Sequence, residues 1–143
     1  MSRIHRAAIQ AAIADADERE RNRSIVVLAV DDAAENLHIL KTILGLAGYA
    51  FFGVPSGHEC LRIVNRLQPR LILLDIEMKG MDGFETCRRL HELPALRTVP
   101  IVFATAHKQE EDLRAGLAVG GTDYLVKPFD FIRLLERRSE EHT

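Results

Sequence analysis

The stretch Ile25-Val-Val-Leu-Ala-Val-Asp-Asp32 is an unbroken apolar run that ends in two acidic residues. Two further runs have a similar form, Leu71-Ile-Leu-Leu-Asp75 and Ile101-Val-Phe-Ala-Thr105. Short continuous runs rich in β-branched residues are typical of strands buried on both faces of a parallel sheet. Residues 50–54 and 124–126 are shorter candidates for strands.

Helical patterns lie between and after these runs. Apolar residues at helical spacing mark them, and the segments are 37–47, 56–64, 82–90, 113–117 and 131–135. Gly48 ends the first, Ser56-Gly-His-Glu59 reads as a capping box at the start of the second, and Asp82 opens the third. Five strands that alternate with five helices predict an α/β fold with a five-stranded parallel sheet.

Composition supports one globular domain. The chain has 143 residues, 47% of them hydrophobic, and 19 basic residues against 21 acidic ones give a net charge of −2. This balance offers no general attraction to nucleic acid or an anionic membrane, and no apolar run is long enough to span a bilayer. Two cysteines cannot form a disulfide scaffold, and Cys60 and Cys87 are expected to pack in the core. We expect a cytoplasmic protein with free thiols.

The first 23 residues differ from the rest of the chain. Ile9, Ala12, Ile13 and Ala16 form a weak helical stripe, and residues 15–23 are almost all polar. We therefore expect an extra N-terminal helix and a charged, solvated link over residues 1–23, followed by the main domain over 24–143. A frayed terminus is the alternative interpretation.

Polar side chains follow four of the predicted strands. Asp31 and Asp32, Asp75, Thr105 and Lys127 all come at strand ends, which meet at one edge of a parallel sheet. Each alone has an ordinary explanation, as a helix cap or as the start of a polar loop. Together they predict a functional crevice.

Three carboxylates at one place repel one another and need a positive partner. Lys127 is one candidate, and a hard divalent cation is the other, because carboxylate and carbonyl oxygens suit Mg²⁺, with Mn²⁺ as a second choice. A carboxylate beside such an ion, an ammonium and a hydroxyl can attack a phosphoryl group. The predicted product is an aspartyl phosphate.

These residues resemble the receiver domain of two-component response regulators. Asp31-Asp32 with Asn36, Asp75 within Leu-Asp-Ile-Glu-Met-Lys-Gly-Met-Asp-Gly-Phe-Glu, Thr105 and Asp-Tyr-Leu-Val-Lys-Pro-Phe129 carry the resemblance. It runs from about Ile25 to the last helix. It implies a doubly wound, flavodoxin-like (βα)5 receiver fold, similar to that of the chemotaxis regulators.

The resemblance also implies a role for each position. Asp75 would be the phosphoacceptor, and the cation would be held by Asp31, Asp32, Asp75 and the carbonyl of Glu77. Lys127, in a cis Lys-Pro bond, would pair with the phosphoryl group. Thr105 and Tyr124 would form the switch, and Glu77 and His107 would tune hydrolysis. The alternative interpretations are half-buried packing for Tyr124 and simple exposure for Glu77 and His107.

The resemblance implies a signalling module that takes its phosphoryl group from a histidine kinase or phosphotransfer protein. Output would go to a protein partner or to self-association, through the face of the fourth helix, fifth strand and fifth helix or through the N-terminal helix. No external substrate would be turned over. The alternatives are a binding module that does not use phosphorylation and an aspartate-nucleophile phosphatase. The latter typically has a second Asp where this chain has Glu77, and no cap domain is present.

Two positions depart from the family pattern. Lys79 stands where the family usually has proline, so the loop after Asp75 is expected to be more mobile or to carry extra positive charge. Gly120-Gly121 replaces a more usual Gly-Ala. The chain is expected to be either a single-domain receiver or a segment of a longer regulator.

Overall fold

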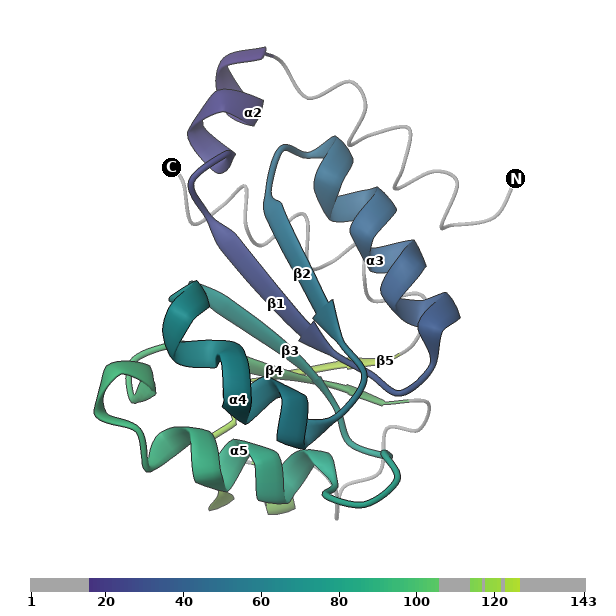
Figure 1. Ribbon diagram of the computed structural model, residues 1–143, viewed down its shortest axis with the longest axis vertical. Coiled ribbons are helices and arrows are strands. Elements are labelled where there is room, and N and C mark those ends of the chain that lie inside the picture. The colour runs from purple at the N-terminus through teal and green to yellow at the C-terminus, as the bar shows by residue number, and fades with distance from the viewer. Residues whose placement is uncertain (1–15, 106–113, 117, 122, 127–143) are drawn as a thin grey trace.

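The computed structural model describes residues 16–105, 114–116, 118–121 and 123–126. A sheet of parallel strands runs through its centre in the order β2-β1-β3-β4-β5 (Figure 1). The strands are β1 (Val26–Val30), β2 (Ala50–Val54), β3 (Leu71–Asp75), β4 (Ile101–Thr105) and β5 (Asp123–Val126). The α/β fold with a parallel sheet, predicted from the apolar runs, is therefore confirmed.

The helices alternate with these strands. They are α2 (Ala16–Asn22), α3 (Ala34–Leu46), α4 (Gly57–Leu67), α5 (Gly83–His91) and the short 3-10 helix η1 (Pro94–Leu96). The first three helices predicted for the main domain thus correspond to α3, α4 and α5. Residues 114–116 and 118 are also helical, whereas the helix predicted at 131–135 lies outside the described residues. Among the described helices, none is long and apolar enough to cross a membrane.

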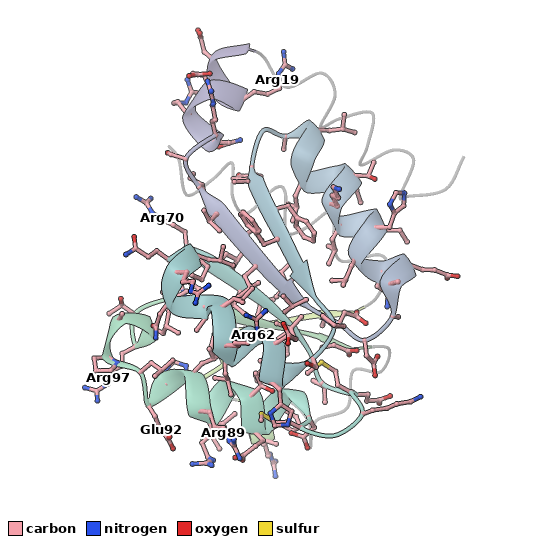
Figure 2. The ribbon with its side chains drawn as sticks, viewed as in Figure 1. Arg19, Arg62, Arg70, Arg89, Glu92 and Arg97 are labelled. Carbon is pink, nitrogen blue, oxygen red and sulfur yellow. The ribbon has the colours of Figure 1, made fainter. Side chains whose placement is uncertain are left out.

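Two hydrophobic cores lie on opposite faces of the sheet. Side chains of β1 alternate between them, because successive residues of a strand point to opposite faces. Val27 and Ala29 pack in one core, and Leu28 and Val30 pack in the other. The first core is covered by α3, and α4 and α5 lie on the other face of the sheet (Figure 1). Charged side chains such as Arg62, Arg89 and Arg97 are exposed on the outside (Figure 2). Burial on both faces explains why the strands read as continuous apolar runs.

The predicted starts of α4 and α5 and the predicted end of α3 are confirmed, but the capping box at α4 is confirmed only in its Ser56 half, because the Glu59 carboxylate pairs with Arg62. The Ser56 hydroxyl accepts from the N–H of Glu59 at 3.1 Å at the start of α4. The Asp82 carboxylate accepts from the N–H of Glu85 at 2.9 Å at the start of α5. After α3, Gly48 adopts a φ of 98°, a left-handed conformation that suits glycine.

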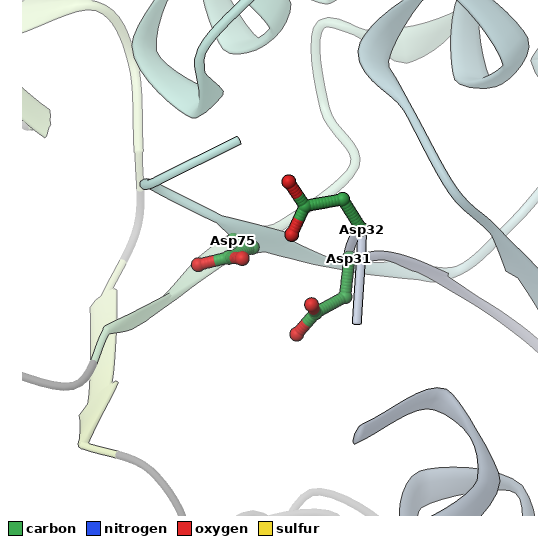
Figure 3. A group of neighbouring side chains, drawn as sticks. All are labelled: Asp31, Asp32 and Asp75. Carbon is green, nitrogen blue, oxygen red and sulfur yellow. The ribbon is translucent and has the colours of Figure 1, made fainter. Parts of the chain in front are cut away.

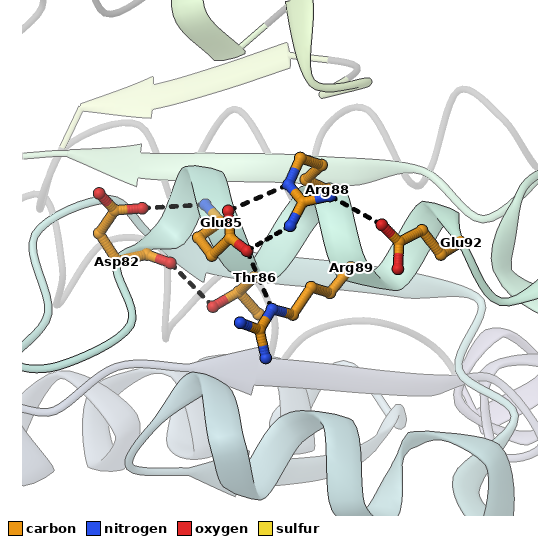
Figure 4. Close-up of polar contacts among 6 residues, drawn as sticks. All are labelled: Asp82, Glu85, Thr86, Arg88, Arg89 and Glu92. Atoms are coloured by element: carbon orange, nitrogen blue, oxygen red, sulfur yellow. Dashed lines mark hydrogen bonds and ion pairs between the residues drawn. The ribbon is translucent and has the colours of Figure 1, made fainter.

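Ion pairs cover the exposed side of α5 (Figure 4). Glu85 accepts hydrogen bonds from Arg88 and Arg89, and Arg88 also pairs with Glu92. The hydrogen bonds from Arg88 and then Arg89 lower the pKa of Glu85 to about 2. Exposed pairs of this kind add little to stability, so this surface serves mainly to solvate the helix.

The segment before β1 differs from its prediction. A solvated link was expected there, but residues 16–22 form α2, and its last residue, Asn22, is buried. The Asn22 side-chain amide donates to the carbonyl of Ala47 at 2.7 Å. A Cβ on Gly48 would lie 2.6 Å from the carbonyl oxygen of Arg19, so the two backbones are in close contact. The polar segment is thus packed on the end of α3. The predicted stripe over 9–16 lies, except for Ala16, outside the described residues.

Candidate functional site

The strand order creates a crevice at one edge of the sheet. β1 lies between β2 and β3, so the chain passes first to one side of β1 and then to the other. Ligand sites of doubly wound sheets form at such a reversal, outside the carboxyl ends of the two strands. Asp31 and Asp32 follow β1, and Asp75 is the last residue of β3.

The three carboxylates converge at this reversal (Figure 3). One oxygen of each of Asp31, Asp32 and Asp75 lies within 4.8 Å of the others. Asp31 and Asp75 are buried, with 3% and 5% of their surface exposed, whereas Asp32 is exposed. The acids predicted to meet at the sheet edge therefore do so, and one of them faces solvent.

Backbone N–H groups and one amide side chain hold the carboxylates. Asp31 accepts from the N–H of Ala33 at 2.9 Å and from the side-chain amide of Asn36 at 3.1 Å. The possibility that Asp31 or Asp32 caps α3 from the N-cap position is wrong, because Ala33 occupies that position without a side-chain bond. The acids are left to face the crevice.

The loop after β3 supplies two further donors. The N–H of Glu77 donates to Asp75 at 3.3 Å, and the N–H of Lys79 donates to Asp32 at 3.1 Å. Donation by N–H groups stabilises the charged form of a carboxylate. These bonds offset part of the repulsion among the three acids.

Gly83 fixes the distance between this loop and β3. Its N–H donates to the carbonyl of Ile76 at 3.0 Å, and a Cβ at this position would lie 2.3 Å from the carbonyl oxygen of Asp75. The N–H of Ile76 in turn donates to the carbonyl of Ala104 in β4 at 3.2 Å. Only glycine allows α5 to begin this close to the end of β3.

The donor set suits a hard divalent cation. Three carboxylates within a few ångströms offer the oxygen ligands that Mg²⁺ and Mn²⁺ prefer, and they offer no sulfur or imidazole. Mg²⁺ usually keeps several waters and binds through a few carboxylates, so an exposed ligand such as Asp32 fits its coordination. The residues present therefore fit the predicted ion.

The other predicted residues are only partly described. Thr105 ends β4, one residue after the partner of Asp75 in the ladder, and Tyr124 lies in β5 opposite Phe103. Glu77 is exposed, and its backbone N–H donates to Asp75. Lys127, its bond to Pro128 and His107 lie outside the described residues.

Cys60 and Cys87 pack in the core beneath α4 and α5, as predicted. Burial raises the pKa of each thiol to about 12. A thiol is nucleophilic as its thiolate, so neither cysteine is equipped for chemistry at neutral pH.

Two contacts of the site have no clear signature in the sequence. The N–H of Lys79 is a backbone group, and a residue's type does not show where its N–H points. Gly83 stands in a motif that indicates the start of a helix, and its contact with Asp75 depends on the packing of α5. For the Lys79 contact, the sequence offers one indication, which is that Lys79 stands where the family usually has proline.

A doubly wound parallel sheet in the order β2-β1-β3-β4-β5, with a crevice at the point where the strand order reverses, is typical of flavodoxin-like domains. The family model for the response regulator receiver domain matches residues 27–138. The chain therefore belongs to the response regulator receiver family, and the predicted resemblance is confirmed.

Curated relatives agree with this assignment. An uncharacterized 14.6 kDa protein of Leptolyngbya boryana is 38% identical over 109 residues, which cover 76% of this chain and 83% of the relative. Response regulator PleD of Caulobacter vibrioides is also 38% identical, over 111 residues that cover 78% of this chain. The match spans only 24% of PleD, so this chain corresponds to one part of that protein.

Solved structures show the same fold. Chemotaxis protein CheY4 of Vibrio cholerae superposes with a TM-score of 0.77 at 31% identity, covering 81% of this chain and 97% of CheY4. A response regulator of Chloroflexus aurantiacus, described as putative, superposes with a TM-score of 0.75 at 32% identity, covering 81% and 95%. The flavodoxin-like receiver fold is thus established for this chain.

Proposed function

We propose that this receiver domain accepts a phosphoryl group on Asp75 in a reaction that requires Mg²⁺ or Mn²⁺. The observation that carries the proposal is the position of Asp75, a buried carboxylate at the end of β3 within 4.8 Å of Asp31 and Asp32. Bound by the three acids, the cation would neutralise charge on the phosphoryl oxygens.

Asp75 acts as the nucleophile in this proposal. One carboxylate oxygen attacks phosphorus, the bond from phosphorus to the donor atom breaks, and the donor leaves with the electron pair. The N–H of Glu77 orients the attacking carboxylate through its 3.3 Å bond. The hydrogen bonds from Ala33 and Asn36 hold the Asp31 carboxylate in place beside Asp75.

The remaining roles follow the family resemblance. Lys127 would pair with the transferred group, and Thr105 and Tyr124 would change position in response to it. Glu77 and His107 would tune the attack of water on the product. The location of Thr105 at the end of β4, beside the strand that carries Asp75, supports its role in the switch.

The donor is proposed to be a histidine kinase or a phosphotransfer protein in the cytoplasm. A curated relative named signal transduction histidine-protein kinase BarA, from Shigella flexneri, is 34% identical over 115 residues, which cover 80% of this chain and 12% of the relative. The output would be binding to a protein partner or self-association, through the surface of the fourth helix, fifth strand and fifth helix or the N-terminal helix. No external substrate would be turned over.

Intact-mass measurement after incubation with acetyl phosphate tests this function. We expect one added phosphoryl group that requires both the divalent cation and Asp75, and therefore is absent from Asp75→Asn. Asp17→Asn, an exposed acid on α2, is the matched control and should label normally. A folded, cation-bound protein without label would favour a binding module that does not use phosphorylation. Steady release of phosphate from an ester would favour the phosphatase.

A further inference from the structure

The hydrogen bond between Lys79 and Asp32 differs from the other backbone contacts of the acid cluster. Asp31 and Asp75 each accept the N–H of the residue two positions later, Ala33 and Glu77 respectively. Such contacts form within one loop. The donor to Asp32 lies 47 residues further along the chain, so this bond joins the loop after β1 to the loop after β3.

This bond restricts the side chain of Asp32, which burial does not restrict as it does those of Asp31 and Asp75. Asp31 and Asp75 are buried and each accepts an N–H from its own loop, whereas Asp32 is exposed and accepts the N–H of Lys79 from another loop. An exposed aspartate samples several rotamers, and fixing it when a ligand binds costs conformational entropy. A hydrogen bond that already holds the side chain removes part of that cost.

The bond leaves Asp32 able to bind a cation. The N–H occupies one lone pair of Oδ2, and an ionised carboxylate offers about four such sites on its two oxygens. Oδ1 in particular remains available. Partners of this kind orient metal ligands, and their loss weakens metal binding.

We propose that the backbone N–H of Lys79 is a positioning group that holds Asp32 toward Asp31 and Asp75, and so increases the affinity of the site for a divalent cation. The inference rests on the proposed function, because it assigns a cation to these acids. It gives Lys79 a role different from the two expected from the sequence, a more mobile loop and added positive charge. Proline has no N–H, so a receiver with proline here lacks this contact.

Mg²⁺ titration followed by calorimetry, without any phosphoryl donor, tests the proposal. Lys79→Pro removes the N–H, and we expect its affinity for Mg²⁺ to fall about 5-fold. Lys79→Ala keeps the N–H and removes the ammonium, so its affinity should equal or slightly exceed that of the wild type. Urea unfolding of both variants shows whether they fold.

Amide hydrogen exchange provides a second readout that needs no proline. The N–H of Lys79 should exchange more slowly in the wild type than in Asp32→Ala, because Asp32 is its acceptor. Asp17→Ala should leave this exchange rate unchanged.

Several results would overturn the inference. The first is a folded Lys79→Pro that binds Mg²⁺ with the affinity of the wild type, and the second is a Lys79→Ala whose affinity for Mg²⁺ falls as much as that of Lys79→Pro. The others are a wild-type protein that binds no Mg²⁺ and an exchange rate of the Lys79 N–H that Asp32→Ala does not change. If Lys79→Pro fails to fold, the exchange rate decides. If Mg²⁺ binding and amide exchange give the expected results but no phosphoryl group is transferred to Asp75, the proposed function is rejected and the positioning role of Lys79 is retained.

Discussion

Gly83→Ala should destabilise the protein through one backbone contact. A Cβ on Gly83 would lie 2.3 Å from the carbonyl oxygen of Asp75 and 2.8 Å from the Cα of Ile76. Both neighbours are backbone atoms, which cannot rotate away, so α5 must move from the end of β3. Overpacking of this kind costs about 1–3 kcal/mol, and we expect the upper end of that range here.

Gly45→Ala is the matched control. Gly45 lies exposed within α3, and a Cβ there would meet nothing within 4 Å. Alanine is favoured over glycine inside a helix by about 1 kcal/mol, so this variant should be more stable than the wild type. The same chemical change is therefore expected to have opposite effects at the two positions.

Urea unfolding distinguishes the two variants. With a slope of about 2 kcal/mol per molar urea, the midpoint should fall by about 1.5 M for Gly83→Ala and rise by about 0.5 M for Gly45→Ala. Because α5 begins beside Asp75, Gly83→Ala should also label more slowly with acetyl phosphate. A Gly83→Ala midpoint at or above that of the wild type would refute the close approach of the two backbones.

Further outcomes are expected for a buried amide, a helix cap and the two core thiols. Asn22→Ala should lower the free energy of unfolding by about 1 kcal/mol, because the carbonyl of Ala47 loses its donor. The control Asp17→Ala, at an exposed position of α2, should leave the free energy of unfolding unchanged. A urea midpoint of Asn22→Ala equal to that of the wild type would show that α2 is not packed on α3. Ser56→Ala should lower it by about 1 kcal/mol through loss of the α4 cap, and full recovery in Ser56→Asp, but not in Ser56→Val, would identify the cap as the cause. Cys60 and Cys87 should resist a thiol reagent at pH 8 until urea unfolds the protein, and rapid reaction of the native protein would contradict their burial. Because their folded pKa is raised from 9.0 to about 12, their contribution to stability is complete below pH 9 and declines as the pH rises toward 12.

Much of the fold is predictable from the sequence, because a strand that is buried on both faces of the sheet is a continuous apolar run in the sequence. The run from Ile25 to Val30 is apolar throughout, since Val27 and Leu28 enter different cores. The convergence of Asp31, Asp32 and Asp75 follows from topology alone, because parallel strands end at one edge.

The α2 segment shows where such reasoning stops. Its charged residues indicate a solvated chain, and Asp17, Arg19 and Glu20 are indeed exposed. The anchor is Asn22, a polar residue that is buried because it satisfies the carbonyl of Ala47. A polar side chain that is buried for its hydrogen bond looks the same in a sequence as one that is solvated, so the packing of this segment could not be predicted.

The same limit applies at the site, where side-chain chemistry is predictable and backbone contacts are not. Carboxylates that follow parallel strands predict an acidic edge of the sheet, but the orientation of each carboxylate depends on the N–H groups of Ala33, Glu77 and Lys79. The first two follow from local chain geometry. The third requires the loop after β3 to reach the loop after β1, and Gly83 brings the end of the loop after β3 close to Asp75. Gly83→Ala should therefore weaken the Lys79 contact as well, and faster exchange of the Lys79 N–H in that variant would show that one glycine sets the geometry of both loops.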